Sequence, residues 1–539
     1  MWDFPPTNGQ HGFSGPRLGA RLSGTPALTK ARPGPASDPL CMRIGMTVSG
    51  GKAAIGIEGF DDILSGGLSR GRVHVLEGNP GTGKTTIAMR FLLQGARDGE
   101  AGLYITLSES EAELRDSAAS HGWSIDEPVT IFELVPPESL LDEAQQQSLL
   151  YSSDLELGET TRRIFDIVDE LKPKRIIIDS LSEIRLLAQS SLRYRRQIAS
   201  LKHYLARTGA TVVLLDDLTS GEEDRSVHSV AHAVIRLEEL SPHYGPERRR
   251  LRVIKYRGQK YRGGYHDFAI QTGGVQVFPR LVSSEHKRDF AREVLKTDSP
   301  ELNELMGGGI ERGSSGLILG PSGTGKSLLA LSFAAWAVQR GERAAAFIFD
   351  EELGLLFNRA RGLGIDLEKM SADGRLLIEQ IDAAELSPGE FIQKARAQVE
   401  QNDVRTVIID SLNGYQAAMP EEQSLILHLH ELLQYLNRQG VTTLLTVAQH
   451  GLVGDMKSPV DVTYLADTVI LLRYFEAFGR VRRAMSVIKK RTSPHEDTIR
   501  EYRIGNRGIS LGQPLEGFQG VLRGVPTYIG EGRPLMSPE

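Results

Sequence analysis

The sequence GNPGTGKT at residues 78–85 occurs again, as GPSGTGKS, at residues 320–327. Both copies have the complete P-loop pattern, whose glycines let the backbone curl so that its amide groups point at phosphate oxygens. The lysine then reaches the β- and γ-phosphates, the next hydroxyl binds Mg²⁺, and the following helix points its positive end at the anion. A chance glycine-rich turn is the alternative, and two complete copies disfavour it. The predicted ATP-binding residues are Gly78, Gly81, Thr82, Gly83, Lys84, Thr85 and Thr86, and Gly320, Gly323, Thr324, Gly325, Lys326, Ser327 and Leu328.

The repetition extends far beyond the two phosphate loops. The P-loop lysines, Lys84 and Lys326, are 242 positions apart. The apolar stretches RIIIDS and TVIIDS place Asp179 and Asp410 231 positions apart, and the basic elements that begin at Lys255 and Lys489 are 234 positions apart. Three nearly equal offsets in the same order indicate a duplicated unit of about 235 residues.

Each half alternates short apolar runs with helical patterns. The first half has the runs VHVLEG, GLYITLS, RIIIDS and ATVVLLDD, and each half ends in a hairpin-like stretch, at residues 248–270 and 482–504. This alternation is typical of an α/β fold with a mostly parallel central sheet flanked by helices. We therefore predict two tandem RecA-like P-loop domains, at residues 46–284 and 285–523, between a disordered leader (residues 1–45) and a short C-terminal tail (residues 524–539).

Composition restricts the class of protein. Of 539 residues 40% are hydrophobic and 24% charged, and the formal net charge is −6, so no overall basic excess indicates nucleic acid or a membrane surface. Cys41 is the single cysteine, which excludes a disulfide framework and favours a reducing, cytoplasmic compartment. The sequence has neither a long apolar run nor a hydrophobic signal core. Translation could start at Met1, Met42 or Met46.

Carboxylates follow the apolar runs where a P-loop enzyme needs them. Asp179 and Asp410 end predicted strands and are expected to hold Mg²⁺ together with Thr85 and Ser327. The alternative for each aspartate is a cap on a strand–helix turn.

A second carboxylate has to orient the attacking water in such a site. In the second half FIFDEE offers Asp350 and Glu351, and in the first half LYITLSES offers Glu109. These are the predicted catalytic residues. Acidic residues at a strand end also begin helices, and in the first half this alternative remains open.

The terminal hairpin-like stretches carry Lys255 and Arg257 in the first half and Lys489 and Arg491 in the second. A cation fixed there could stabilise charge on the γ-phosphate of a neighbouring subunit. A solvated charged hairpin is the alternative, and the repetition of these cations in both halves favours the functional interpretation.

Together these motifs resemble the KaiC family of double-domain clock ATPases and autokinases over residues 51 to about 528. The resemblance implies ATP-dependent hexamers with Mg-ATP between subunits, and it implies that Lys255, Arg257, Lys489, Arg491 and His495 serve the adjacent subunit's site. Tyr261 replaces a histidine that is common in the family. Asp350 and Glu351 match the family's catalytic acid pair, whereas the first half has Ser108 before Glu109. Whether the first domain hydrolyses ATP or only binds it therefore stays open.

The resemblance also implies a phosphorylated loop, which here reads SPVDVTYLADTVILL (residues 458–472). Thr463 lies at the family's serine position and is the predicted phosphoacceptor. Tyr464 lies at the threonine position, and Ser458 is a weaker candidate. Only nine residues follow GVLRGVPTYIG, so no KaiA-type partner is expected. A KaiB-like protein or a histidine kinase could be the signalling partner.

Two other functions share this core. One is a DNA-dependent ATPase related to RecA and RadA, which needs basic loops at the ring centre. The loop HGLVGDMKSPVDVTY (residues 450–464) is nearly neutral, so a nucleic-acid partner is not expected. The other is a scaffold that uses ATP only to assemble a ring. We therefore expect a cytoplasmic ATPase and serine/threonine autokinase that acts as a timing or signalling switch, with no membrane contact.

Overall fold

The structure is a computed structural model that describes residues 51–134, 149–218, 226–241, 245–417, 422–449, 451, 461–506, 508–523 and 526–529. The predicted leader with Cys41, the weaker acceptor Ser458 and most of the predicted tail lie outside these residues.

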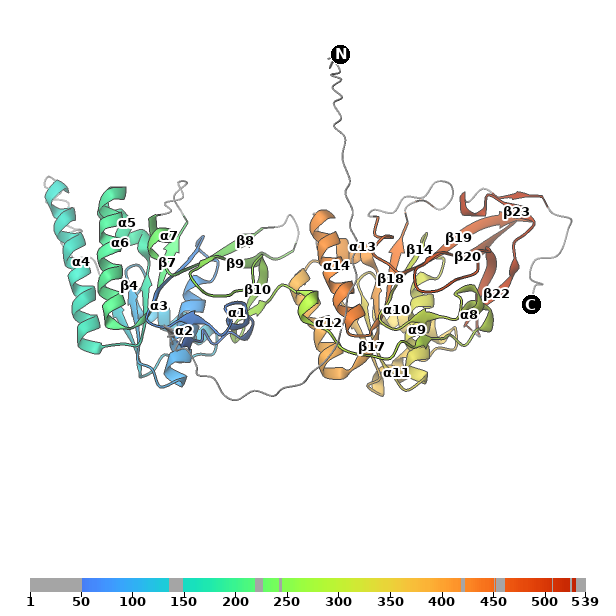
Figure 1. Ribbon diagram of the computed structural model, residues 1–539, viewed down its shortest axis with the longest axis horizontal. Helices are drawn as coiled ribbons and strands as arrows, with labels where there is room; N and C mark the ends of the chain where they lie inside the picture. Colours follow the sequence, from blue (N-terminus) through green and yellow to red (C-terminus); the bar gives the residue numbers. More distant parts are fainter. Residues whose placement is uncertain are drawn as a thin grey trace, which may run out of the picture. The chain divides into compact units, whose positions relative to one another are not determined.

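The described part of each half contains nine strands that form one sheet (Figure 1). Those of the first half are β3 (Val73–Gly78), β4 (Gly102–Thr106), β5 (Val129–Glu133), β6 (Arg175–Asp179), β7 (Thr211–Asp217), β8 (Ala233–Leu240), β9 (Arg248–Tyr256), β10 (His266–Gln271) and β11 (Gly274–Phe278). Those of the second half are β14 (Ser315–Gly320), β15 (Arg343–Ile348), β16 (Leu376–Gln380), β17 (Val404–Asp410), β18 (Thr442–Ala448), β19 (Thr468–Ala477), β20 (Arg480–Lys490), β21 (Arg500–Gly505) and β22 (Gly508–Pro514).

The two sheets have the same strand order. The first runs β5-β4-β6-β7-β3-β8-β9-β10-β11 and the second β16-β15-β17-β18-β14-β19-β20-β21-β22. Neighbours are parallel from β5 to β8 and from β16 to β19, and antiparallel beyond them. The predicted fold class is thereby confirmed. The predicted hairpin-like stretches contain most of β9 and β10 in the first sheet and of β20 and β21 in the second, and the antiparallel strands β11 and β22 follow them.

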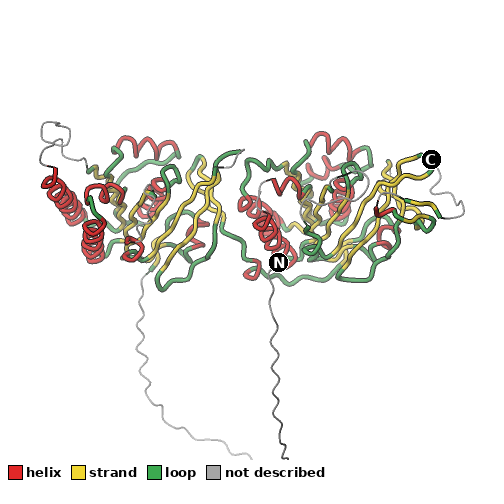
Figure 2. The backbone as a smooth tube through the Cα atoms, turned by 90° about the horizontal axis from the view of Figure 1, so that it is seen from above, coloured by secondary structure: helices red, strands yellow, loops and turns green. Residues whose placement is uncertain are grey.

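Helices cover both faces of each sheet (Figure 2). In the first half they are α1 (Glu58–Ile63), α2 (Lys84–Arg97), α3 (Glu111–Ser120), α4 (Leu149–Leu171), α5 (Leu181–Ala188), α6 (Ser191–Thr208) and α7 (Ser226–Val230). In the second half they are α8 (Pro300–Leu305), α9 (Lys326–Gln339), α10 (Leu353–Arg361), α11 (Leu367–Ala372), α12 (Pro388–Asn402), α13 (Leu412–Ala417) and α14 (Glu422–Arg438). Short elements complete the described chain: β1 (Lys52–Ala53), β2 (Leu68–Ser69), β12 (Val294–Leu295), β13 (Ile310–Glu311), β23 (Phe518–Gln519), β24 (Thr527–Tyr528), and the 3₁₀ helices η3 (Ser283–Glu285) and η4 (Val521–Arg523).

Several helices begin where local side chains satisfy the free amide groups of the first turn. The Ser110 hydroxyl accepts from the Glu113 amide (3.3 Å), and the Glu113 carboxylate accepts from the Ser110 amide (2.8 Å), which is a capping box at the start of α3. At the start of α12 the Ser387 hydroxyl accepts from the Glu390 amide (3.2 Å), and Pro388 follows in the first turn.

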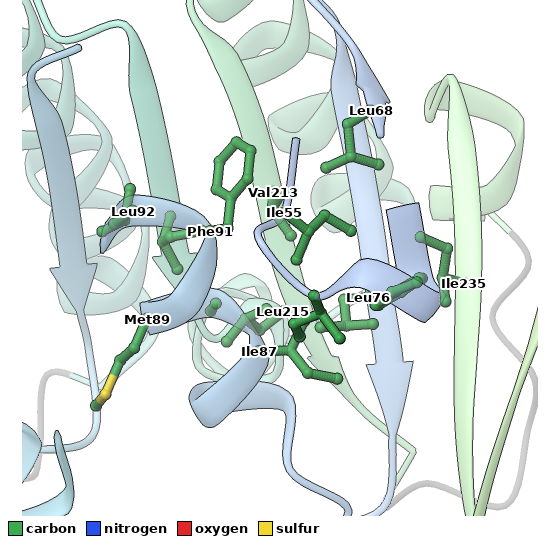
Figure 3. Close-up of a cluster of buried hydrophobic side chains, with 14 of the residues drawn as sticks. Ile55, Leu68, Leu76, Ile87, Met89, Phe91, Leu92, Val213, Leu215 and Ile235 are labelled. Carbon is green, nitrogen blue, oxygen red and sulfur yellow. The ribbon is translucent and has the colours of Figure 1, made fainter. Parts of the chain in front are cut away.

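In the first half, successive side chains of a parallel strand pack into hydrophobic clusters on opposite faces of the sheet. In β6, Ile177 packs toward α2, whereas Ile176 and Ile178 pack toward the face covered by α4, α5 and α6. Figure 3 shows Ile87 of α2 beside Leu76 and Leu215 of the sheet. Strands buried on both faces explain the continuous apolar runs in the sequence. This packing fixes the carboxyl ends of the strands, where the phosphate loops begin.

Two buried histidines, His74 and His266, make the stability of the first domain depend on pH. Burial lowers the pKa of His74 to about 3 and that of His266 to about 4. His266 Nδ1 accepts a hydrogen bond from the Arg280 amide (2.9 Å), which requires the unprotonated nitrogen. Between pH 6.5 and 4 the unfolded chain binds more protons, so stability falls as the pH falls. Each histidine lowers the free energy of unfolding by about 1.4 kcal/mol for every pH unit of acidification in that window.

We expect the urea midpoint of the first domain to drop between pH 7 and pH 5, and to drop less in His74→Gln. The glutamine amide can still donate to the Ser69 carbonyl that His74 Nε2 contacts at 2.9 Å. Equal pH slopes for the two proteins would contradict this origin.

Candidate functional site

Both phosphate loops connect a central strand to a helix. In the first half the loop joins β3 to α2, and in the second half it joins β14 to α9. Gly83 and Gly325 precede the helices with φ of 93° and 96°, in the left-handed region that glycine adopts most readily. A Cβ added at Gly83 would come within 2.6 Å of the Ile270 side chain. Conformation and space both require glycine at this point of the loop.

The P-loop lysines point back into their own loops. Lys84 Nζ donates to the carbonyls of Gly78 (3.0 Å) and Asn79 (2.9 Å), and it lies 2.7 Å from the Asp217 carboxylate. Lys326 Nζ donates to the Pro321 carbonyl at 2.9 Å. Burial lowers the pKa of Lys326, and the nearby charge of Asp410 acts against this. Both lysine side chains therefore lie against the phosphate loop that connects a strand to a helix.

Threonines brace the two loops identically. Thr82 Oγ1 donates to the Asn79 carbonyl and Thr324 Oγ1 to the Pro321 carbonyl, each at 2.8 Å. Of the remaining predicted phosphate-loop residues, Gly78 and Gly320 end the strands β3 and β14, Gly81 and Gly323 lie in the turns, and Thr86 and Leu328 lie in the first turns of α2 and α9.

A hydroxyl and a carboxylate meet beside the first loop. Thr85 Oγ1 lies 3.4 Å from the Asp179 carboxylate at the end of β6. Burial raises the pKa of Asp179, while a 2.5 Å hydrogen bond from the Tyr104 hydroxyl lowers it. Among the described residues no group of three or more His, Cys, Asp or Glu could hold a metal ion alone. One hydroxyl and one carboxylate fit a Mg²⁺ that takes its other ligands from phosphates and water.

The second half holds its aspartate differently. Asp410 ends β17 and accepts a hydrogen bond from Thr446 of β18. By strand register, Leu215 lies at the position of Thr446 in the first half and Ala346 at the position of Tyr104 in the second. The supporting hydroxyl thus comes from opposite neighbouring strands in the two sites. Neither hydroxyl was predicted from the sequence, and Tyr104 inside an otherwise apolar strand was the available signal.

The predicted catalytic carboxylates lie at matching strand ends. The Leu107 amide donates to the Asp179 carbonyl and the Phe349 amide to the Asp410 carbonyl, each at 2.7 Å. The next residues, Ser108 and Asp350, therefore occupy equivalent positions. Glu109 and Glu351 follow them in the same register.

The surroundings of these acids differ between the halves. Burial, followed by the charges of Asp179 and Glu113, raises the pKa of Glu109. Asp350 accepts a hydrogen bond from the Ser411 hydroxyl, and Glu351 forms a 2.7 Å ion pair with Arg359. The third acid of the second half, Glu352, caps α10 through the amides of Gly354 and Leu355.

The cations predicted to serve the neighbouring subunit are Lys255 and Arg257 in the first half and Lys489 and Arg491 in the second. They lie toward the amino ends of the parallel strands, whereas the phosphate loop follows the carboxyl end of its strand. Lys489 pairs with Val469 across the antiparallel strands β19 and β20, and Val469 pairs with Leu317 of β14. The P-loop glycine, Gly320, is three residues further along β14, about 10 Å at the usual rise of a strand. Lys255 has the same register in the first half, where it pairs with Val234.

These cations contact the backbone of the segment that precedes the neighbouring strand. Lys489 Nζ donates to the carbonyls of Thr463 and Ala466, both at 2.8 Å, and Arg491 donates to the Tyr464 carbonyl at 2.8 Å. In the first half Lys255 donates to the carbonyls of His228 and Ala231, and Arg257 to that of Ser229.

The matching contacts place His228 at the position of Thr463, the predicted phosphoacceptor. His228 Nε2 lies 2.6 Å from the carboxylate of Glu77, a buried residue of β3 that Arg236 also contacts at 2.7 Å. None of the ion pairs of Glu77 was predicted from the sequence.

Thr463 lies in a local turn. Its hydroxyl and its amide both donate to Asp461 Oδ1, at 2.7 and 3.0 Å. These bonds lower the pKa of Asp461. The Tyr464 side chain is 50% exposed and Tyr261 is 38% exposed. His495 Nε2 is buried and has no hydrogen-bond partner in the described part of the chain.

Two arginines at the start of the hairpin-like stretch at residues 248–270 pair with acidic neighbours. Arg249 lies 2.9 Å from Glu239, and Arg250 lies 2.8 Å from Glu238 on the adjacent strand β8. Carboxylates of β8 therefore compensate the charge of these two arginines. No helix in the described ranges combines the length and the apolar character needed to cross a membrane.

A family model described as "ATPase: KaiC" matches the chain twice, over residues 53–282 and 295–516. "Circadian clock protein KaiC3" from Synechocystis is 28% identical over 491 residues, which are 88% of this chain and 95% of the relative. "Circadian clock oscillator protein KaiC" from Parathermosynechococcus lividus is 29% identical over 490 residues, with coverage of 89% and 88%. "Circadian clock protein KaiC2" from Synechocystis is 27% identical over 493 residues, with coverage of 90% and 83%.

Proposed function

The chain belongs to the KaiC family of ATPases, and we propose that it works as a Mg²⁺-dependent hexamer in which each subunit's second domain phosphorylates Thr463 of its neighbour. As a KaiC-family ATPase it binds and hydrolyses ATP. The clock names of its relatives support a role as a timing or signalling switch, with a KaiB-like protein or a histidine kinase as partner.

The register of the second sheet is the observation that carries this proposal. Lys489, Arg491 and the Thr463 loop lie at the amino ends of β14 and β19, whereas the P-loop begins at the carboxyl end of β14. The acceptor and the cations are therefore too far from their own chain's phosphates to act on them. An adjacent subunit that presents its P-loop to this edge would bring all the parts together.

The chemistry follows from the residues at each end of the sheet. Lys326 and the loop amides bind the phosphates, and Ser327 with Asp410 would hold Mg²⁺, which neutralises charge on the phosphate oxygens. Glu351 accepts the proton as Thr463 Oγ1 bonds to the γ-phosphorus and the bond to the β–γ bridging oxygen breaks, releasing ADP. Lys489 and Arg491 of the subunit that carries the acceptor orient its loop and stabilise the transferring phosphate.

Assembly is expected to depend on nucleotide, because each site is incomplete until a neighbour's cations reach the phosphates. Light scattering of the full chain should give the mass of a monomer or a small oligomer without ATP and of six subunits with saturating Mg-ATP. The double variant Arg257→Ala/Arg491→Ala should assemble less well. Val481→Ala is the control, because it truncates an exposed side chain of β20 that is none of the proposed cations. A chain that stays monomeric in saturating Mg-ATP would refute the hexamer.

A further inference from the structure

The first ATP site carries a carboxylate that the second site lacks. By strand register Gly78 of β3 pairs with Asp217 of β7, and Gly320 of β14 pairs with Ala448 of β18. Asp217 and Ala448 therefore occupy equivalent positions, each at the carboxyl end of the strand next to the P-loop strand. At another strand end the difference is reversed, because Ser108 of the first half lies where the second half has the acid Asp350.

Two contacts orient the Asp217 carboxylate. Oδ1 lies 2.7 Å from Lys84 Nζ, and Oδ2 accepts a hydrogen bond from the Ser182 hydroxyl at 3.1 Å. At the equivalent position of the second half, Asn413 instead bonds the backbone of Ala448, at 2.8 and 3.2 Å. The local structure of each half is thus adapted to the presence or absence of this side chain.

The position of Asp217 is suited to holding a water molecule at the γ-phosphate. A P-loop lysine binds phosphate oxygens at about 2.8 Å, so a carboxylate in contact with the same ammonium lies within about 6 Å of them. A single water can bridge that distance. Asp217 also lies close enough to Glu109 for its charge to be among the causes, after burial, Asp179 and Glu113, that raise the pKa of Glu109.

We propose that Asp217 is a catalytic residue of the first ATP site, where it holds the attacking water in place of the acid that Ser108 does not supply. One O–H of the water donates to Asp217 and the other points at Glu109. The water oxygen bonds to the γ-phosphorus, the bond to the β–γ bridging oxygen breaks, ADP leaves, and Glu109 takes the water proton. The inference rests on hydrolysis of ATP by the first domain.

The test uses the full chain with Lys326→Ala, so that hydrolysis reports the first site. Asp217→Ala and the isosteric Asp217→Asn should each lower kcat about 100-fold while KM for ATP changes less than about threefold. Adding Ser108→Asp to Asp217→Ala should recover at least tenfold, because it returns a carboxylate to the strand end used in the second site. ADP affinity and thermal unfolding should stay close to those of the Lys326→Ala parent.

Several results would overturn the assignment of Asp217 while leaving hydrolysis at the first site intact. They are an unchanged kcat, a loss confined to KM, and a loss reversed by raising the Mg²⁺ concentration, which would make Asp217 a metal-site residue. A faster rate in Asp217→Ala would also overturn it, because it would mean that the carboxylate inhibits Lys84. If the Lys326→Ala parent turns over no ATP, hydrolysis at the first site itself fails, and Asp217 has no reaction to serve.

Discussion

Lys326→Ala should abolish phosphate transfer to the protein and leave ATP-dependent assembly largely intact, whereas Lys84→Ala should impair assembly and leave transfer in the assembled fraction. Removing a P-loop lysine deletes a charge that stabilises the phosphates, an effect of about 3 kcal/mol or 100-fold in a water-poor site. The two halves differ at the catalytic strand end, with Ser108 and Glu109 against Asp350 and Glu351, so the second site is the better equipped for transfer.

The division of labour is measured by light scattering for assembly and by γ-labelled ATP for phosphate retained on the chain. Matched Lys→Arg variants at both positions keep the charge and report on its geometry. If Lys84→Ala and Lys326→Ala lose assembly and transfer to the same extent, the two sites do not divide these tasks.

Glu351→Gln should slow phosphate transfer about 100-fold, because an amide cannot take the proton of the acceptor hydroxyl. Folding should be little affected, since the ion pair between Glu351 and Arg359 is partly exposed and such pairs contribute little to stability. Binding of ADP should be unchanged.

Glu352→Gln is the matched control for this variant. The Glu352 carboxylate caps α10 and accepts from the Gly354 and Leu355 amides, so its substitution changes charge next to the site without changing the proposed base. The initial rates of label transfer in Glu351→Gln and Glu352→Gln are compared. Equal losses in the two variants, or no loss in Glu351→Gln, would remove Glu351 from the role of base.

Much of this architecture follows from local sequence. The phosphate loops, the buried strands and the duplication are visible because glycine spacing and apolar runs are properties of contiguous residues. The double RecA-like fold and the family were predicted on that basis and are confirmed.

The site contacts that sequence analysis missed depend on strands that are far apart in the chain. Tyr104 reaches Asp179 from 75 positions away, and Asp217 reaches Lys84 across the β3–β7 register. Likewise, only the pairing of β19 and β20 shows that Lys489 lies toward the amino end of β19, at the end of the sheet opposite its own P-loop. Pattern along the sequence predicts which elements form, but side-chain partners between them depend on register.

A mixing experiment tests most directly whether the second domain phosphorylates its neighbour. Chains with Lys326→Ala have an intact Thr463 but no active second site, and chains with Thr463→Ala have an active second site but no acceptor. Each is incubated alone with Mg-ATP, the two are then mixed and assembled together, and the loop is examined by mass spectrometry. We predict phosphate on Thr463 of the Lys326→Ala chain in the mixture and none in either protein alone. An unmodified Thr463 in the mixed rings, alongside continued ATP hydrolysis, would contradict phosphate transfer between subunits.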